Sequence, residues 1–195
     1  AIWLTANDAW WNRAPQVRYI RASIYDTADQ QTVIKECLKE LEVDDKKYPP
    51  RGVLSAISNA KDQLMDPLEY EEQNRGDYYF SVIAKLYSLY QKKLKLNNAL
   101  DFDDLIVNTV RLFEECPDVL EYYQDRFRYI LVDEYQDTNH AQYRLVSLLA
   151  SSRKNLCVVG DDDQSIYKFR GADIRNILGF EKEFSNCKVI KMEEN

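Results

Sequence analysis

Apolar residues recur at helical spacing through roughly the first 115 residues of the chain. Such spacing is typical of amphipathic helices that bury one face. The first twenty residues are rich in tryptophan, show no clean period and stay unassigned. The expected helices span residues 28–42, the stretch from Pro50 to just before Pro67, 79–96, and a segment that starts at a cap on Asp101. The spacing of Thr27 and Gln30 predicts a capping box for the first helix.

The pattern changes after Pro117, where a short helix leads to Phe127. Three short apolar runs follow, separated by helical patterns at about 139–152 and 173–183, and they are "RYILV" (128–132), "NLCVV" (155–159) and "CKVIKM" (187–192). Strands that alternate with helices pair in parallel through crossover connections. We therefore expect an α/β fold, part of a doubly wound parallel sheet, with ligands at the carboxyl ends of its strands.

The bulk composition excludes several classes of protein. The chain has 195 residues, of which 45% are hydrophobic and 30% charged, and no apolar run reaches the length of a membrane span. It lacks a secretory signal at its start, so we expect a cytoplasmic protein and no membrane partner. The net charge of −7 argues against a protein that coats nucleic acid with positive charge. The four cysteines form no CxxC pair, and Cys37 and Cys157 are expected to be buried thiols.

Acidic residues follow two of the predicted strands. Asp133 and Glu134 come directly after the first strand, and Asp161, Asp162 and Asp163 follow the second. Gathered carboxylates repel one another unless a cation compensates them, and Mg²⁺ prefers one or two carboxylates together with waters and phosphate oxygens. These acids therefore predict a divalent-cation site, although acidic turns after strands are also common on protein surfaces.

The second acidic cluster opens the loop "VVGDDDQSIYKFRGAD" (158–173). In this loop Tyr167 and Phe169 alternate with Lys168 and Arg170. Aromatic rings that alternate with basic groups can stack on bases while the cations meet phosphates. The simpler interpretation is that the two rings only pack the loop onto the sheet.

These two stretches carry a family resemblance. "VDEYQDTN" (132–139) and "VVGDDDQSIYKFRGAD" (158–173) resemble motifs II and III of the UvrD/Rep/PcrA-type superfamily 1 DNA helicases. "LDFDDLI" (100–106) and "KVIKMEEN" (188–195) are similar to adjoining segments of that family. The resemblance covers about residues 23–195, with the motifs in the family's order and at plausible spacing.

The resemblance implies a fold and a division of the chain. The fold would be a partial RecA-like P-loop NTPase parallel sheet with a large all-helical subdomain. Residues 1–22 would be an unassigned N-terminal segment, 23–98 a helical accessory insert, and 99–195 a partial RecA-like motor domain without the P-loop strand. The function would be that of a portion of an ATP-dependent DNA helicase, which couples ATP hydrolysis to translocation on single-stranded DNA and to duplex unwinding.

The resemblance also implies roles for individual residues. Asp133 would coordinate the Mg²⁺ of bound Mg-ATP, and Glu134 would be the general base that activates water against the γ-phosphate. Gln164 would sense the γ-phosphate, and Arg170 would help to connect the nucleotide site with the DNA site. Phosphoryl transfer of this kind relies on positioning and charge stabilisation, so it needs all of its parts.

The expected partner is single-stranded or forked DNA. By the resemblance, Tyr167 and Phe169 would stack on bases, with Lys168 beside them. The family often has tryptophan at the position of Phe169, which changes the size of the stacking surface but not its chemistry.

One essential motif is absent. A P-loop needs GxxxxGK[ST], and none of the five glycines is followed by lysine. We therefore expect the chain alone to bind neither ATP nor Mg²⁺, to hydrolyse no ATP and to unwind no DNA. The resemblance implies that the P-loop strand would lie between the strands at 155–159 and 187–192, so its absence would leave a gap there. Because unpaired strand edges invite pairing, we expect collapse of the gap or self-association.

Two other functions remain open from the sequence. One is a non-catalytic module that binds single-stranded DNA or a protein, which the missing P-loop favours for the isolated chain. The other is a two-metal nuclease built on the two acidic clusters, which metal-dependent cleavage of DNA by the purified chain would support.

Overall fold

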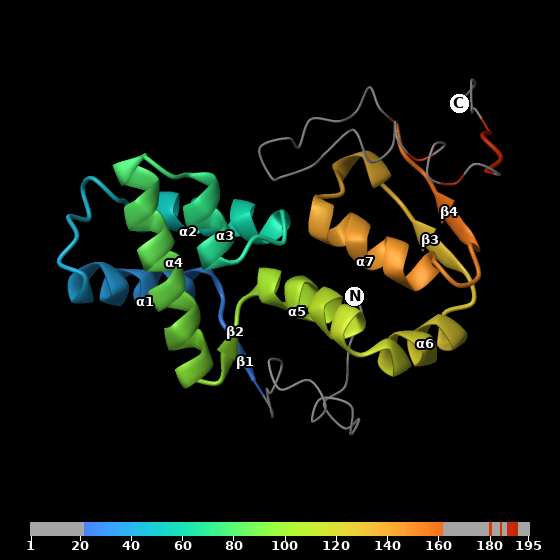
Figure 1. Cartoon of the computed structure of the whole chain (residues 1–195), viewed down its shortest axis with the longest axis horizontal. Coiled ribbons are helices and arrows are strands. Elements are labelled where there is room, and N and C mark those ends of the chain that lie inside the picture. Colours follow the sequence, from blue (N-terminus) through green and yellow to red (C-terminus); the bar gives the residue numbers. More distant parts are fainter. Residues whose placement is uncertain (1–21, 162–179, 181–183, 185–186, 191–195) are drawn as a thin grey trace.

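The computed structural model describes residues 22–161, 180, 184 and 187–190, and these residues form two halves (Figure 1). The helices α1 to α4 make up one half, and the other contains α5 to α7 with a small sheet. The elements are β1 (Ser23–Ile24), α1 (Thr27–Glu40), α2 (Pro50–Asp62), α3 (Pro67–Gln73), α4 (Tyr78–Leu96), β2 (Ala99–Leu100), α5 (Phe102–Glu115), α6 (Pro117–Arg126), β3 (Ile130–Val132), the 3₁₀ helix η2 (Tyr135–Asp137), α7 (His140–Ala150) and β4 (Leu156–Val158). The chain is thus mostly helical with two small parallel sheets.

The cap of the first helix lies one residue earlier in the chain than expected. Asp26, not Thr27, caps α1, since its carboxylate accepts hydrogen bonds from the main-chain N–H groups of Ala28 and Asp29. Asp29 completes the capping box by accepting from the N–H of Asp26. The predicted capping box of Thr27 and Gln30 was therefore wrong. The pair Asp26 and Asp29 has the same spacing and similar capping chemistry, and it forms the box instead.

The helical half has its own hydrophobic core. Seventeen buried residues between Val33 and Ala99 form one cluster. α1 presents Val33, Ile34, Cys37 and Leu38 to it, and α4 contributes Ile83, Leu86, Tyr90 and Leu94 among others. The helix α3, which the sequence reading did not anticipate, adds Tyr70 and has its own capping box on Asp66 and Glu69. No described helix combines the length and apolar character needed to cross a membrane.

The region before residue 115 is not entirely helical, contrary to the sequence prediction. Ser23 and Ile24 pair in parallel with Ala99 and Leu100. Two-residue strands are too short to show a period of two, so the sequence carries no readable signal for them. The pairing joins the start of the described chain to the segment that precedes α5. It crosses the expected domain boundary between residues 98 and 99, and that boundary stays a prediction.

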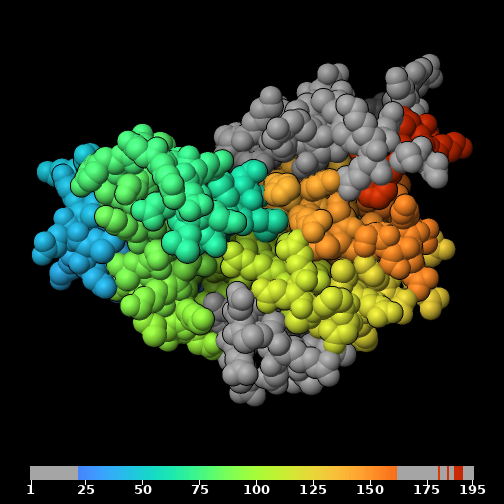
Figure 2. Space-filling model, in the orientation of Figure 1, coloured from blue at the N-terminus to red at the C-terminus, as the bar shows by residue number. Residues whose placement is uncertain are grey.

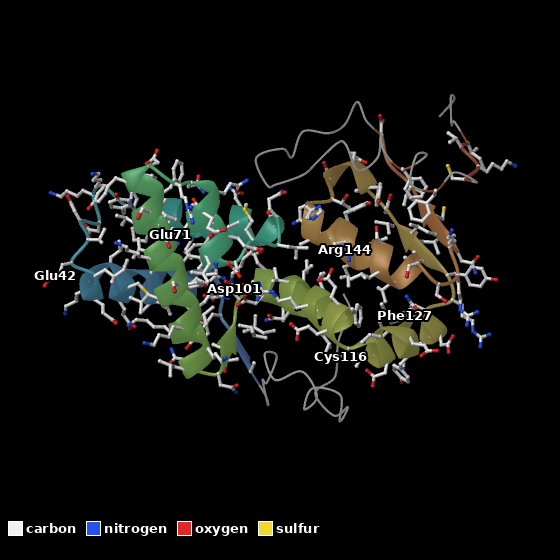
Figure 3. The ribbon with its side chains drawn as sticks, in the orientation of Figure 1. Glu42, Glu71, Asp101, Cys116, Phe127 and Arg144 are labelled. Atoms are coloured by element: carbon white, nitrogen blue, oxygen red, sulfur yellow. The ribbon has the colours of Figure 1, made fainter. Side chains whose placement is uncertain are left out.

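The second half confirms the first strand, helix and strand of the predicted alternation. β3 and β4 pair in parallel, with Ile130 opposite Leu156 and Val132 opposite Val158, and α7 forms the connection between them. A smaller core of Leu112, Phe113, Val119 and Leu149 lies beneath them. Arg144, labelled in Figure 3, lies on α7. It forms an ion pair with Glu114 on α5 at 2.8 Å.

The strand expected at 187–192 does not form over its described residues, 187–190. The N–H of Cys187 donates to the carbonyl of Phe184, three residues back, so it makes a turn bond in place of a strand bond. Val189 and Ile190 are exposed, at 56% and 73%. The helix expected at 173–183 lies almost wholly outside the described residues.

One face of the β3–β4 sheet is exposed. Leu131 is 78% exposed at the centre of β3, and its partner Cys157 is also exposed. Neighbouring Tyr129 and Val159 add apolar surface at 77% and 44% exposure. The prediction that Cys157 is buried was therefore wrong, because alternate side chains of a strand point to opposite faces and only one face is covered here. Cys37 is buried, as expected.

The two halves are in contact on the face drawn in Figure 2, and α2 packs against both α5 and α7. A charged cluster lies buried at this junction, near the start of α5 where Figure 3 labels Asp101. Lys61 of α2 is 1% exposed, and its Nζ lies 2.6 Å from Asp101 and 2.8 Å from Asp104. The hydroxyl of Tyr90 donates to Asp101 at 3.0 Å. The cluster joins α2, α4 and α5 through groups that the hydrophobic pattern does not reveal.

Candidate functional site

The acidic pair Asp133 and Glu134 lies where β3 ends. The parallel register places Val132 opposite Val158, so the carboxyl ends of β3 and β4 share one edge of the sheet. Asp133 and Glu134 therefore neighbour the loop that starts after β4 with Gly160 and Asp161. Both acidic side chains are exposed. The sequence prediction that the two acidic segments meet at one edge is confirmed for the described residues, which include Asp161.

The chain turns sharply at Glu134. Its backbone is left-handed, with φ of 50° and ψ of 43°, a conformation that few residues other than glycine adopt. The N–H of Glu134 donates to Oδ1 of Asp133 at 2.9 Å. Sparsely populated backbone conformations persist where surrounding contacts enforce them and are frequent at functional sites. Both carboxylates are exposed beside this turn at the end of the strand.

Main-chain hydrogen bonds fasten this turn to β4. The N–H of Val159 donates to the carbonyl of Val132 at 2.8 Å, and the N–H of Tyr135 donates to the carbonyl of Val159 at 2.9 Å. Tyr135 is buried, and its ring meets that of Phe180 edge to face at 5.7 Å. The acidic turn is thus held by main-chain hydrogen bonds to Val159 and by the buried side chain of Tyr135.

Gln136 connects the two loops through its side chain. The residue is 1% exposed. Its Nε2 donates to Oε2 of Glu134 at 2.8 Å, and its Oε1 accepts from the N–H of Asp161 at 3.1 Å. Both polar ends of the amide are therefore hydrogen-bonded, one to the turn after β3 and the other to the loop after β4.

The residues after Gln136 tie this region to the helical half. Oδ1 of Asp137 is buried and accepts no hydrogen bond from the described residues. Asn139 caps α7 by accepting from the N–H of Gln142, and its Nδ2 donates to Oδ1 of Asp62, the last residue of α2. A single side chain thus connects the helix that follows the acidic turn with the other half of the molecule.

Asp62 lies in an environment that favours its neutral form. Burial raises the pKa of its carboxyl from 3.8 to about 7, and the charge of Asp103 on α5 adds to the rise. The protonated acid keeps a carbonyl oxygen that can accept from Asn139, so the link between the halves is compatible with either protonation state.

The described residues contain no group of three or more histidine, cysteine or acidic side chains arranged around a common point. A dense two-metal site of the nuclease type is therefore not formed by the residues from 22 to 161. An exposed carboxylate such as Asp133 fits the sparser set that Mg²⁺ uses when waters and phosphate oxygens supply the other ligands.

Five of the predicted site residues lie outside the described part of the chain, namely Gln164, Tyr167, Lys168, Phe169 and Arg170. Their roles stay predictions, as do those of Asp133 and Glu134. Sequence reasoning missed Gln136 and the link from Asn139 to Asp62. The only available signal was the run of polar residues that follows Tyr135, which does not show which neighbours each side chain meets.

Comparison with known proteins places these features in a family. The model of the UvrD/REP helicase N-terminal domain matches residues 13–185. The chain is 57% identical over 173 residues to the ATP-dependent DNA helicase PcrA of Bacillus subtilis (strain 168), a match that covers 89% of this chain and 23% of that protein. The PcrA helicases of Staphylococcus aureus (strain Mu50) and Staphylococcus epidermidis are 56% and 53% identical over 173 residues, again 89% of this chain and 24% of theirs. The chain thus spans about a quarter of the length of these relatives. The chain belongs to the UvrD/REP helicase N-terminal domain family.

Proposed function

We propose that this chain is part of the motor of an ATP-dependent DNA helicase, in which ATP hydrolysis drives translocation on single-stranded DNA and duplex unwinding. The observation that carries the proposal is the exposed pair Asp133 and Glu134 at the carboxyl end of β3, held beside the end of β4. Ligands of open parallel sheets bind at such ends. The family and the printed names of the relatives support the same function.

In this proposal Asp133 holds the Mg²⁺ that accompanies ATP. Its carboxylate is exposed, and the N–H of Glu134 already fixes one of its oxygens. The bound ion would neutralise charge on the phosphate oxygens. The fold would be the partial RecA-like sheet that the sequence resemblance implies, with the helical half as its accessory insert.

Glu134 is proposed as the general base. Its position at the end of a strand and its exposed carboxylate leave it accessible to a water molecule, while Gln136 restrains one of its oxygens. A base must lie within hydrogen-bond reach of the proton that it accepts, so restraint of the carboxylate contributes directly to the rate.

The residues of the following loop complete the proposal. Gln164 would report the state of the γ-phosphate, and Arg170 would connect the nucleotide site with the DNA site. Tyr167 and Phe169 would stack on bases of single-stranded or forked DNA, with Lys168 near the phosphates. These assignments rest on the resemblance of "VVGDDDQSIYKFRGAD" to the family's motif.

The chain alone is proposed to be inactive, because it carries no GxxxxGK[ST] motif to hold the phosphates.

Self-association is proposed through the incomplete sheet, supported by the exposed Tyr129, Leu131 and Val159. Sedimentation of the purified chain tests this second point. We expect oligomers that Leu131→Lys dissociates, and a monodisperse monomer would contradict the proposal.

The function is tested in the full-length helicase that carries this segment, by measuring ATP hydrolysis with single-stranded DNA present. Glu134→Gln is expected to lower kcat by about 10²- to 10⁴-fold while ATP binding persists. Asp133→Ala is expected to remove the dependence on Mg²⁺ along with activity. Glu115→Gln, an exposed acid at the end of α5, is the matched control and should hydrolyse ATP at the wild-type rate. Wild-type hydrolysis by Glu134→Gln would overturn the proposal.

Nucleotide binding by the isolated chain is a separate test. Calorimetric titration of Mg-ATP into the chain should show no binding heat, because the phosphate cradle is absent. Binding that Asp133→Ala abolishes would show that a cradle exists without a P-loop, and would overturn the proposed inactivity of the isolated chain.

A further inference from the structure

Gln136 is an unusual residue for its position. Its side chain is 1% exposed, yet it carries two polar groups and lies beside a pair of exposed acids. Buried amides are costly unless both of their polar ends find partners. Here both do, since Nε2 donates to Glu134 and Oε1 accepts from the main-chain N–H of Asp161.

The partners fix the orientation of the amide. The N–H of Asp161 can only donate, so it requires the oxygen of Gln136. A carboxylate can only accept, so Glu134 requires the amide nitrogen. Rotation of the amide by half a turn would place two oxygens together at one end and two N–H groups at the other. The side chain therefore has one favourable orientation, and in it the amide joins the two loops.

Gln136 connects the main chain at Asp161 with the side chain of Glu134. Asp161 begins the loop that, further along the sequence, contains Gln164 and Arg170. Glu134 ends the turn after β3, where its left-handed backbone fixes the main chain but not the tip of its side chain. The amide nitrogen of Gln136 donates to the Glu134 carboxylate and so restrains the tip of that side chain. Movement of the main chain at Asp161 would thus be transmitted to that carboxylate.

We infer that Gln136 is a positioning residue for ATP hydrolysis, which orients the carboxylate of Glu134 and connects it to the main chain at Asp161. This inference rests on the proposed function, because it takes Glu134 to be the general base. Gln136 itself does not touch the nucleotide in this role. It restricts the range of positions of the base and makes that range depend on the main chain at Asp161.

Two substitutions separate the two hydrogen bonds. Gln136→Met has nearly the same length and fills the same space, but it loses both bonds. Gln136→Glu keeps an acceptor for Asp161 and replaces the donor to Glu134 by a second carboxylate. Like charges at such short range favour protonation of one member of the pair. The two variants should therefore differ in how their activity depends on pH.

The experiment measures ATP hydrolysis by the full-length helicase with single-stranded DNA, together with the number and affinity of ATP sites. Gln136→Met is expected to lower kcat by about 10- to 100-fold, since small errors in placing a catalytic group are costly. Its ATP affinity should stay within about threefold of wild type, because Gln136 acts on the base and not on the ATP. The ratio of wild-type to Gln136→Met kcat should be constant with pH.

Gln136→Glu should behave differently. The ratio of wild-type to variant kcat should fall as the pH rises from about 6 to about 9, because both carboxylates become ionised and the base recovers its active form. A role limited to folding would reduce the number of ATP sites in both variants and leave kcat per site and its pH dependence unchanged. That outcome, or a Gln136→Met kcat within twofold of wild type, would overturn the inference.

Glu134→Gln is measured alongside as the reference. If it retains wild-type activity, the proposed function fails and the inference fails with it. If Glu134→Gln is inactive while Gln136→Met is fully active, the proposed function stands and only the positioning role is excluded.

Discussion

The Nζ of Lys61 lies 2.6 Å from Oδ2 of Asp101, 40 residues further along the chain, and both side chains are almost completely buried. Asp104 accepts from the same ammonium group at 2.8 Å, so two carboxylates share one cation. Tyr90 donates to Asp101, and Gln91 donates to Asp104. The junction between the two halves is therefore held by a buried, hydrogen-bonded charge cluster as well as by apolar packing.

Removal of the cation should be strongly destabilising. Lys61→Met leaves two buried carboxylates without their partner, and loss of one member of a buried pair costs about 3–5 kcal/mol. Burial already raises the pKa of Asp104, against the opposing effect of Lys61, so loss of that lysine removes the main group that favours its charge. Urea unfolding of the chain measures the change in the free energy of unfolding.

The control for this prediction is an ion pair at the surface. Arg75 and Glu72 lie 3.2 Å apart with side chains that are 78% and 70% exposed. Arg75→Met should change the free energy of unfolding by no more than about 0.5 kcal/mol. If Lys61→Met were as mild as Arg75→Met, the buried cluster would not hold the junction together.

Asp62 should make the stability of the chain depend on pH. Its pKa is about 7 in the folded chain and 3.8 ordinarily, so between these values the folded chain keeps a proton that the unfolded chain has released. The free energy of unfolding contributed by this group therefore falls as the pH rises through that window, and it stays low above pH 7. Asp62→Asn keeps an oxygen for Asn139 but cannot ionise.

We therefore expect Asp62→Asn to gain stability relative to wild type as the pH rises from about 5 to about 8. Urea unfolding of both proteins across this range gives the difference at each pH. Asp45→Asn, at an exposed acid in the loop before α2, should show a difference that does not change with pH. A flat difference for Asp62→Asn would show that the carboxyl is not held in its neutral form by burial.

The sequence predicts the helices of this chain far better than its polar contacts. The periods of Val33 to Leu38 and of Val82 to Leu94 locate α1 and α4, and Asp101 caps α5 as predicted. Apolar periodicity reports which face of a helix is buried, and that information is local. The acidic pair at the end of β3 was predictable for the same reason, since strand ends follow from the apolar run.

Contacts between distant residues could not be predicted in this way. Lys61 lies at helical spacing from Leu54 and Ile57, but periodicity does not show that a lysine at this position is buried against the carboxylates of Asp101 and Asp104. Their burial depends on how α2 and α5 pack, which periodicity does not determine. The strand expected at 187–192 does not form over residues 187–190 for a related reason, because a strand needs a paired neighbour and the N–H of Cys187 donates to the carbonyl of Phe184 instead.

The start of α1 offers a direct test of its cap. Asp26 accepts from the N–H groups of Ala28 and Asp29, whereas Thr27 lies inside the helix. Asp26→Ala should lower the free energy of unfolding by about 0.5–2 kcal/mol through loss of these bonds. Thr27→Ala should be close to neutral, because alanine is favoured inside helices. Urea unfolding measures both, and the opposite order would place the cap at Thr27.

The cysteines should differ in reactivity according to which face of their element is covered. Burial raises the pKa of the Cys37 thiol to about 11, and its side chain is inaccessible in the core of the helical half. Cys157 points away from the core on the exposed face of the β3–β4 sheet. The thiolate is the reactive form, and reagents must reach it, so both effects protect Cys37.

A small maleimide should therefore modify Cys157 before Cys37 in the folded chain, as peptide mass spectrometry would show. Cys157→Ser should remove that modification, and denaturation should expose Cys37. Equal rates for the two thiols in the folded chain would contradict the burial of Cys37 and the exposed face of the sheet together.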